Sequence, residues 1–407
     1  MAERRIPDHP EGRAAILVAL VFGMLMAFGP FTIDLYLPAF PAVARDLRTT
    51  ENWVQLTLTA TTLGFGLGQV IIGPLSDAFG RRRPLLFATL LHFAASVAII
   101  FAPSIGWVMA GRVAQGIGAA GSGVLALAMA RDLFEGQRLV RMMTRIALVR
   151  SLAPIVAPVI GAQLLAVVSW RGLFAVLAVF GMTMTVVVSR IIGETLPPER
   201  RSGRSPRDVA GRYARLFQDR FFIGVMAVGG LSFSTTFIYL SWSSFVYQVD
   251  FGFSTQTFGL LFAVNAVGLM ICAQISGRIM RRFRPRHAMT LWLGLMMSGA
   301  VGLWLSQAVA APVWLQLLCL FVVIASGGGI GPAVQVAALS NHGAQAGTAA
   351  AMLGVFNFAV GGTIAPIVGL FGASAATMAG GMIVVIGSAL LVLNFLVRPF
   401  DDGPQLR

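Results

Sequence analysis

The sequence predicts an all-α integral membrane protein with twelve transmembrane helices in two pseudo-symmetric six-helix bundles. Three observations lead to this fold class. Hydrophobic residues make up 57% of the 407 residues, charged residues only 11%, and the mean hydropathy is +0.81. Long apolar stretches recur along the chain, each near the roughly 20 residues that a helix needs to cross the hydrocarbon core of a bilayer. Short segments of the first half also recur in the second half.

The apolar stretches predict one helix each, because they are separated by short breaks that contain polar residues, Pro or Gly. Little chain is left over for a soluble domain. The predicted helices cover residues 14–37, 53–73, 84–102, 107–130, 142–166, 172–192, 221–246, 255–276, 287–306, 313–337, 347–371 and 375–397.

The net charge of +14 comes from arginine, since the chain contains no lysine. Most of these arginines lie before the first helix, after the second, fourth, sixth and eighth helices, or at the end of the chain. Cytoplasmic segments of membrane proteins carry such an excess of basic residues, so both termini are predicted to be cytoplasmic. The predicted location is the bacterial inner membrane, crossed many times. Topology explains the charge, and nucleic-acid binding is not expected.

The longest polar stretch, residues 193–220, is rich in Arg and Pro and lacks apolar periodicity. It predicts a cytoplasmic central loop. The chain would therefore consist of an N-terminal six-helix bundle over residues 1–192 and a C-terminal six-helix bundle over residues 221–407.

Internal repetition supports this division. Residues 73–83 after the second helix are echoed by residues 277–286 after the eighth, and Ala-Pro-Ile-Val at 153–156 recurs at 365–368. Two repeats of six helices with a binding site between them near mid-membrane are the plan of many secondary transporters.

Several motifs resemble a known family. Residues 73–84, Gly-Pro-Leu-Ser-Asp-Ala-Phe-Gly-Arg-Arg-Arg-Pro, resemble the signature that follows the second helix in the major facilitator superfamily. Residues 32–41, 112–116, 153–161 and 194–200 are similar to its Bcr/CflA branch, drug:proton antiporters that include bicyclomycin- and chloramphenicol-type exporters. The resemblance implies a major facilitator fold and proton-coupled export of drugs or other lipophilic small molecules by alternating access.

The partners follow from the same resemblance. We expect a lipid bilayer, a drug-like small-molecule substrate and protons, with the chain acting as a monomer. No cofactor is expected, because the proton gradient would supply the energy. No catalytic residue and no metal site is predicted.

Asp34 is the candidate for proton coupling. A charge within the hydrocarbon is costly and is retained mainly for function. Of the 16 acidic residues, Asp34 alone falls within the body of a predicted helix, while Asp46, Glu51 and Asp250 are expected in outer loops. A structural ion pair or solvation at the helix end remains the alternative, since Asp34 is near the outer end of the first helix.

Arg112 is predicted at a similar depth in the fourth helix, so a salt bridge with Asp34 is expected. Because Arg keeps its proton, its role would be to hold Asp34 ionised until a proton or drug competes. The resemblance also implies a part for Arg112 in coupling. Gln115, three residues on, shares its face of the helix and could line the substrate cavity. A purely structural Arg112 bound to backbone carbonyls is the alternative.

The loop motif predicts a conformational latch. Glycine there would permit close helix approach and a tight turn, and Asp77 can pair with Arg81. The resemblance implies that this cluster latches the cytoplasmic face in the outward-facing state. Its predicted members are Gly73, Asp77, Gly80, Arg81, Arg82 and Asp132.

The fifth helix carries Pro154 and Pro158, followed by Gly161. Each Pro removes a backbone hydrogen bond and loosens the helix. The resemblance implies that this motif bears on helix bending and leak control. Arg150, one turn earlier, and His92 in the third helix are open as to role. Snorkelling to the interface is expected for Arg150, and a packed position for His92.

Drug pockets are mostly apolar and aromatic with a few polar anchors. The aromatic seventh helix therefore contributes candidates for the substrate cavity, against the alternative that its aromatics face lipid. The full set of cavity candidates is Tyr36, Gln115, Phe233, Phe237, Asn265 and Asn357.

Two other functions compete with drug export. The same fold could carry a metabolite, inward or outward, because fold alone does not determine substrate. A membrane-embedded enzyme is the remote alternative. Such an enzyme usually needs paired acids or a metal cluster, and no His, Asp or Glu group converges in this sequence.

Overall fold

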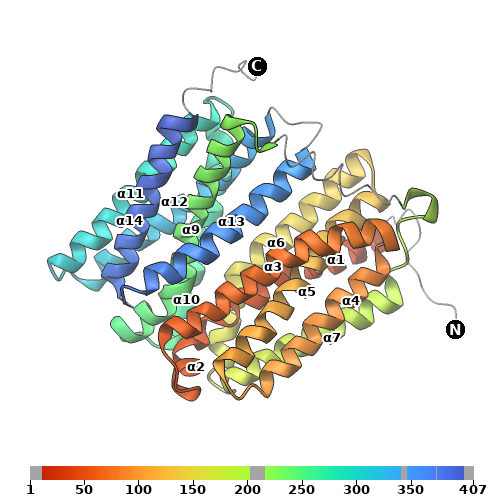
Figure 1. Ribbon diagram of the computed structural model, residues 1–407, viewed down its shortest axis with the longest axis horizontal. Coiled ribbons are helices and arrows are strands. Elements are labelled where there is room, and N and C mark those ends of the chain that lie inside the picture. The colour runs from red at the N-terminus through yellow and green to blue at the C-terminus, as the bar shows by residue number, and fades with distance from the viewer. Residues whose placement is uncertain (1–11, 202–215, 341–345, 373, 398–407) are drawn as a thin grey trace. The chain divides into compact units, whose positions relative to one another are not determined.

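The computed structural model describes residues 12–201, 216–340, 346–372 and 374–397 (Figure 1). Over these residues the regular secondary structure is entirely helical, and twelve helical segments are long and apolar enough to cross a membrane. The predicted all-α integral membrane fold is therefore confirmed. The middle of the predicted central loop and both chain ends lie outside the described residues.

The helices form two compact units. The first contains the helices up to α7, together with residues 255–259 at the start of α10, and the second contains the rest of the helices from α9 onward. The first unit comprises α1 (Gly12–Asp34), η1 (Leu37–Ala39), α2 (Phe40–Asp46), α3 (Glu51–Phe79), α4 (Arg82–Ile100), α5 (Ile105–Leu133), α6 (Gly136–Leu164), α7 (Trp170–Ile191) and η2 (Pro198–Arg200).

The second unit is built around α9. This helix packs against α12, α13 and α14, and α11 packs against α12 and α14. The elements of the second unit are α9 (Arg220–Phe245), η3 (Val246–Asp250), α10 (Thr255–Ile279), α11 (Pro285–Ala308), α12 (Val313–Ser340), α13 (Ala346–Gly369), α14 (Ala375–Val392) and η5 (Leu393–Val397).

Glycine allows the helices of the first unit to approach closely. A Cβ on Gly64 of α3 would lie 2.1 Å from the carbonyl oxygen of Val113 in α5, and a Cβ on Gly116 of α5 would lie 2.2 Å from that of Thr61 in α3. Only glycine fits at either position. Small residues at such crossings are typical of helices packed within a membrane, where close backbone contact replaces the hydrophobic drive.

The second unit uses the same device. A Cβ on Gly328 of α12 would lie 2.0 Å from the carbonyl oxygen of Leu269 in α10, and a Cβ on Gly329 would collide with the ring of Trp292 in α11. Large apolar side chains are meanwhile exposed on many of the helices of both units, as lipid contact requires; examples are Leu63, Leu148, Val179, Leu260 and Val384.

The segment after α1 differs from the sequence prediction. The first helix was expected to run to residue 37 and to be followed by an outer loop that contains Asp46. Instead α1 ends at Asp34, and the chain turns through η1 into the short helix α2, of which Asp46 is the last residue. Pro38 and Pro41 explain the difference, because proline is well tolerated in the first turn of a helix and here begins two new ones.

Asp46 ties α2 to the start of α7. Its carboxylate pairs with the guanidinium of Arg171 and accepts a hydrogen bond of 2.9 Å from Trp170 Nε1. The guanidinium of Arg171 also lies 4.3 Å from the centre of the Trp170 ring. An exposed ion pair and a hydrogen bond therefore connect α2 to α7 at this end of the first unit.

Candidate functional site

Asp34 is the last residue of α1 and is buried, with an exposed fraction of 6%. Its carboxylate forms no ion pair and no hydrogen bond with any side chain or backbone group of the described residues. A buried carboxylate without a partner is costly, and such a group within a membrane span points to a function.

Arg112 of α5 is completely buried, and it does not pair with Asp34. Its Nη1 donates to the carbonyl oxygen of Thr32 at 2.7 Å and to Gln115 Oε1 at 3.1 Å. The salt bridge expected from the sequence is therefore absent between these two described residues. The reason is local: the last carbonyls of a helix lack partners within it, and Arg112 satisfies one in the last turn of α1.

The remaining surroundings of Arg112 are aromatic. The guanidinium carbon lies 4.8 Å from the ring centre of Tyr36 and 5.9 Å from that of Phe174. Nε and Nη2 of Arg112 are buried and have no hydrogen-bond partner among the described residues. The guanidinium thus keeps two donor groups for a further acceptor.

A closed ring of polar side chains surrounds this contact. It consists of one residue of α1, two of α4 and two of α5, all completely buried. We call it the polar ring; its members are Thr32, His92, Ser96, Arg112 and Gln115.

The polar ring is joined by short hydrogen bonds. Gln115 Nε2 donates to Ser96 Oγ at 2.7 Å, and Ser96 Oγ donates to the carbonyl oxygen of His92 at 2.7 Å. His92 Nε2 lies 2.8 Å from Thr32 Oγ1, and the carbonyl of Thr32 returns to Arg112. The ring therefore links α1, α4 and α5 through polar contacts inside the first unit. The sequence indicated Arg112 and Gln115 but not their link to His92.

Tyr36 and Gln115 were predicted to line a substrate cavity. Both are completely buried here. The hydroxyl of Thr57 donates to that of Tyr36 at 3.5 Å, and the Tyr36 ring packs edge-on against Phe40. In this conformation both side chains therefore belong to the packed interior of the first unit.

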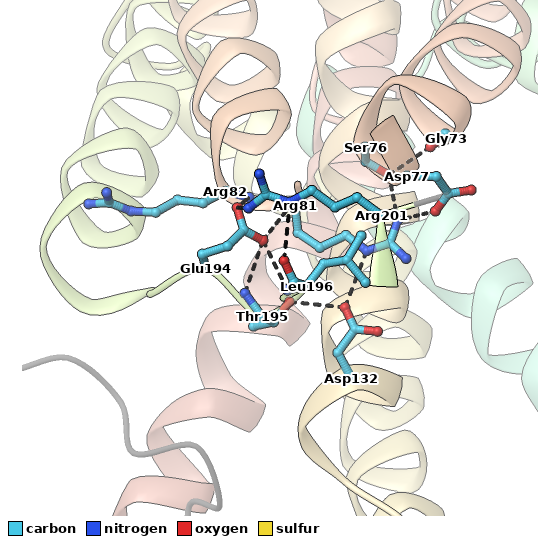
Figure 2. Close-up of polar contacts among 10 residues, drawn as sticks. All are labelled: Gly73, Ser76, Asp77, Arg81, Arg82, Asp132, Glu194, Thr195, Leu196 and Arg201. Atoms are coloured by element: carbon cyan, nitrogen blue, oxygen red, sulfur yellow. Dashed lines mark hydrogen bonds and ion pairs between the residues drawn. The ribbon is translucent and has the colours of Figure 1, made fainter. Parts of the chain in front are cut away.

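A second polar cluster lies at the turn between α3 and α4 (Figure 2). Arg81 is at its centre: Nη1 donates to Asp77 Oδ1 at 2.5 Å and to Ser76 Oγ at 2.7 Å, and Nε donates to Asp132 Oδ2 at 3.2 Å. Asp132 also accepts a hydrogen bond of 3.0 Å from the Thr195 hydroxyl. The predicted pairing of Asp77 with Arg81 is present, and Asp132, expected as a neighbour of this cluster, contacts Arg81 directly. We call this group the turn cluster.

Glu194, just beyond the end of α7, completes the turn cluster. Its carboxylate accepts hydrogen bonds from the backbone N–H groups of Arg81 at 2.8 Å and Arg82 at 3.3 Å (Figure 2). These N–H groups are at the start of α4, where the helix dipole favours an anion. Sequence reasoning assigned Glu194 no site role, and nothing in the local pattern links it to residues more than a hundred positions earlier.

The two glycines of the loop motif behave differently. Gly80 has a φ of +87°, and a Cβ there would lie 2.4 Å from Glu194 Oε2, so the predicted tight turn is confirmed. Gly73 lies within α3, and a Cβ there would meet no described atom within 4 Å. The expectation that Gly73 permits close helix approach is therefore wrong for this conformation. Its carbonyl instead accepts a hydrogen bond from Ser76 at 2.7 Å.

The α6 motif meets α1 directly. Pro154 and Pro158 lie inside α6, which stays helical through both. A Cβ on Gly161 would lie 2.2 Å from the carbonyl oxygen of Leu35, the residue that follows Asp34. Arg150 of the same helix is exposed, as expected for a side chain that reaches outward.

In the second unit, Asn265 of α10 is buried between two tyrosines. Its Nδ2 donates to the hydroxyl oxygens of Tyr239 at 3.0 Å and Tyr247 at 3.1 Å. Phe237 is completely buried, whereas Phe233 is half-buried and lies edge-on to Phe358.

The other predicted anchor, Asn357 of α13, is half-buried, and its Oδ1 has no hydrogen-bond partner among the described residues. No group of three or more His, Cys, Asp or Glu side chains that could hold a metal ion occurs in the described part of the chain.

The sequence model of the Major Facilitator Superfamily matches residues 15–366. The chain belongs to this superfamily. The transporter is 32% identical over 93% of its length to the uncharacterized MFS-type transporter YdgK of Bacillus subtilis, and the match covers 96% of that protein. It is 28% identical to a bicyclomycin resistance protein homolog of Haemophilus influenzae, with 88% and 90% of the two chains covered. It is 26% identical to the multidrug resistance protein MdtL of Salmonella heidelberg, over 93% and 94%.

Solved structures show the same fold. The transporter matches a D-xylose-proton symporter with a TM-score of 0.72 and 18% identity, over 94% of this chain and 97% of the other. A bacterial homolog of the human lysosomal transporter Spinster gives a TM-score of 0.72 at 13% identity, over 95% and 96%. The predicted major facilitator fold and the resemblance drawn from the sequence are therefore confirmed. The chain is a membrane-embedded transporter of small molecules and not an enzyme.

Proposed function

We propose that the transporter exports drugs or other lipophilic small molecules in exchange for protons, with Asp34 as the coupling carboxylate. One observation carries the proposal: Asp34 is buried in a membrane-spanning segment and has no cation partner among the described residues. A group in such a place gains most by exchanging its charge for a proton, because an unpaired ion within hydrocarbon is unstable.

Arg112 would supply the other half of the exchange. In this conformation it binds the carbonyl of Thr32 and Gln115, and it keeps two unused donors, Nε and Nη2. In the opposite state of the alternating-access cycle these donors would bind the ionised carboxylate of Asp34. Proton binding to Asp34 would free Arg112 to bind the Thr32 carbonyl of α1. Drug binding would favour loss of that proton and the return of Arg112 to Asp34. Arg112 itself keeps its proton throughout.

The substrate class rests on the relatives. A bicyclomycin resistance protein homolog and the MdtL multidrug resistance proteins match nearly the whole chain, which supports a place in the Bcr/CflA branch. Half-buried Phe233 and Asn357, together with Phe237 and Asn265, would contribute apolar surface and polar anchors for a lipophilic compound. The likeness to a xylose symporter is one of fold alone, so it supports no sugar substrate.

The remaining parts of the proposal follow the charge pattern. The turn cluster would lie at the cytoplasmic face of the bacterial inner membrane and stabilise the outward-facing state. Both termini would be cytoplasmic, since arginine is concentrated in the segments on the same side of the membrane as the turn cluster. The protein would act as a monomer with the proton gradient as its only source of energy.

Two measurements test the proposal. A drug-susceptibility panel in an efflux-deficient host should show raised resistance to lipophilic antibiotics when the transporter is expressed. In inverted vesicles, the drugs identified should release protons; Asp34→Asn should reduce this release to the level of vesicles without the transporter. Asp46→Asn is the matched control, because it changes another carboxylate of the same segment at an exposed ion pair. Resistance unchanged for every drug, or full proton release by Asp34→Asn, would refute the assignment; uptake of a metabolite would favour the alternative transport function.

A further inference from the structure

His92 of α4 is completely buried and contacts three other helices. Phe28 of α1 packs edge-on against its ring at 4.7 Å between centroids. A Cβ on Gly118 of α5 would lie 2.9 Å from His92 Cβ, and one on Gly181 of α7 would lie 3.2 Å from His92 Nδ1. The ring has little room to move, because glycines of α5 and α7 admit it closely. The position of the His92 ring is therefore set by the packing of α1, α5 and α7 around it.

The one hydrogen bond of the His92 ring goes to Thr32. His92 Nε2 lies 2.8 Å from Thr32 Oγ1, while Nδ1 is buried and has no partner among the described residues. Thr32 is thus held twice: its side chain by His92, and its carbonyl oxygen by Arg112 Nη1 at 2.7 Å. A residue fixed by its side chain presents its carbonyl at a fixed place. The His92 contact therefore adds to the helix backbone of α1 in fixing where Arg112 finds its acceptor.

Asp34 follows Thr32 by two residues and is buried, and in the proposed cycle it is the acceptor that competes with Thr32 for Arg112. The guanidinium has two unused donors, whereas the carboxylate has no partner in the described structure. A bond from Arg112 to an ionised carboxylate would be stronger than a bond to a neutral carbonyl. In this conformation Arg112 nonetheless binds Thr32, and the fixed position of Thr32 favours that contact.

We propose that His92 is a positioning residue of the coupling site: by holding Thr32, it keeps Arg112 on the backbone of α1 and away from Asp34. This inference rests on the proposed function, in which Asp34 exchanges a proton. Loss of the Thr32–His92 hydrogen bond would loosen Thr32, let Arg112 turn to Asp34, and make protonation of the carboxylate require a more acidic medium.

The groups that face this site can be named helix by helix. Titratable or charged side chains come from the end of α1, the residue before η1, α4 and α5. Within the described chain, the other neighbouring helices contribute none: α3 provides the hydroxyl of Thr57, α6 provides its backbone at Gly161, and α7 provides aromatic rings. The titratable and charged members are Asp34, Tyr36, His92 and Arg112.

The test uses four single variants and the Thr32→Val/His92→Leu double variant in purified transporter reconstituted into liposomes, with Asp34→Asn to assign an infrared band. Thr32→Val removes the hydroxyl but keeps the carbonyl that binds Arg112, and His92→Leu removes the ring nitrogen. His92→Gln retains a polar amide near the position of Nε2. Thr89→Val is the matched control, because Thr89 is buried on the same helix and its hydroxyl bonds only within α4, to the carbonyl of Leu86.

Two pH profiles are recorded for each variant. One is drug-driven proton release; the other is the infrared band of the protonated Asp34 carboxyl, identified by its loss in Asp34→Asn and measured without drug. Thr32→Val and His92→Leu should each move both midpoints toward lower pH by about half to one unit, the effect expected from one lost hydrogen bond. The double variant should move them no further than either single change. His92→Gln and Thr89→Val should retain the wild-type profile.

The outcomes separate the two proposals. An unchanged infrared midpoint in Thr32→Val and His92→Leu, additive shifts in the double variant, or an equal shift in Thr89→Val would overturn the role of His92. If the infrared midpoint shifts while wild-type transporter releases no protons on drug addition, the positioning role stands and drug:proton exchange fails. If wild-type transporter releases protons but the infrared midpoint does not move, the exchange stands and the positioning role fails.

Discussion

Gly161 of α6 lies directly against the carbonyl oxygen of Leu35, which is 2.2 Å from the place that a Cβ on Gly161 would take. Leu35 follows Asp34 and precedes Tyr36, so α6 supports the backbone next to the buried carboxylate. Pro158 and Pro154 lie on the same helix, about one and two turns before this contact. Any change in the course of α6 would therefore displace the end of α1.

The contact predicts the effect of a single methyl group. Gly161→Ala should lower the midpoint of thermal unfolding of the purified transporter by the equivalent of about 1–3 kcal/mol, because overpacking against a backbone atom forces a shift of α1 or α6. Transport should fall as well. Gly66→Ala on α3 is the control, since a Cβ there meets no described atom within 4 Å. A midpoint for Gly161→Ala equal to that of Gly66→Ala would show that the helices are not in this contact.

Glu194 predicts a second stability effect, at the opposite face of the first unit from Asp46. Glu194→Ala should lower the unfolding midpoint by the equivalent of roughly 1–2 kcal/mol, because the first N–H groups of α4 lose their acceptor and the helix loses an anion at its start. Glu194→Gln should cost less, since an amide oxygen can still accept. Glu199→Ala, an exposed acid five residues on, serves as control. Equal midpoints for Glu194→Ala and Glu199→Ala would contradict the capping role.

Asn265 predicts a third effect, in the second unit. Asn265→Leu removes the amide that donates to the buried hydroxyls of Tyr239 and Tyr247, so the unfolding midpoint should fall by the equivalent of about 1–3 kcal/mol. Adding Tyr239→Phe and Tyr247→Phe should restore part of the loss, because removal of both partners is less costly than removal of one. Asn394→Leu, at an exposed amide, is the control. No recovery in the triple variant would mean that the loss has another cause.

Side-specific labelling tests the proposed orientation. Ser104 and Glu135 are exposed in the loops at the two ends of α5. In a chain with Cys272→Ser and Cys319→Ser, an impermeant maleimide should label Glu135→Cys in inverted vesicles and Ser104→Cys in intact spheroplasts. The expectation follows from the arginines that flank Glu135, such as Arg131 and Arg138. The reverse labelling pattern would place the termini on the outer side.

The apolar pattern predicted the helices well. The sixth helix was expected at 172–192 and is found at Trp170–Ile191, and the tenth was expected at 313–337 and is found at Val313–Ser340. Hydropathy identifies a membrane helix because an uncharged stretch of this length has no other stable place. The break after Asp34 was not predicted, because a proline such as Pro38 or Pro41 can either end a helix or occupy the first turn of a new one.

Contacts within the candidate sites could be predicted only between residues that lie close together in the sequence. Asp77 and Arg81 are four residues apart on one turn, so their contact follows from spacing. The contact of Arg112 with Gln115, three residues on, agrees with spacing too. Its acceptor in α1 did not follow, because helical spacing shows which residues share a face but not which helix lies opposite. His92 and Thr32 are 60 residues apart and Glu194 is 113 residues from Arg81. Such contacts depend on the packing of whole helices.

The distance in sequence between Glu194 and the start of α4 has a consequence for biosynthesis. The N–H groups of Arg81 and Arg82 are synthesised long before their acceptor has been translated. At about 5–20 residues per second, 113 residues take on the order of 10 s. During that interval the start of α4 lacks this acceptor, which becomes available only when the chain beyond α7 emerges from the ribosome. Truncation just before residue 194 would leave the start of α4 in that nascent state.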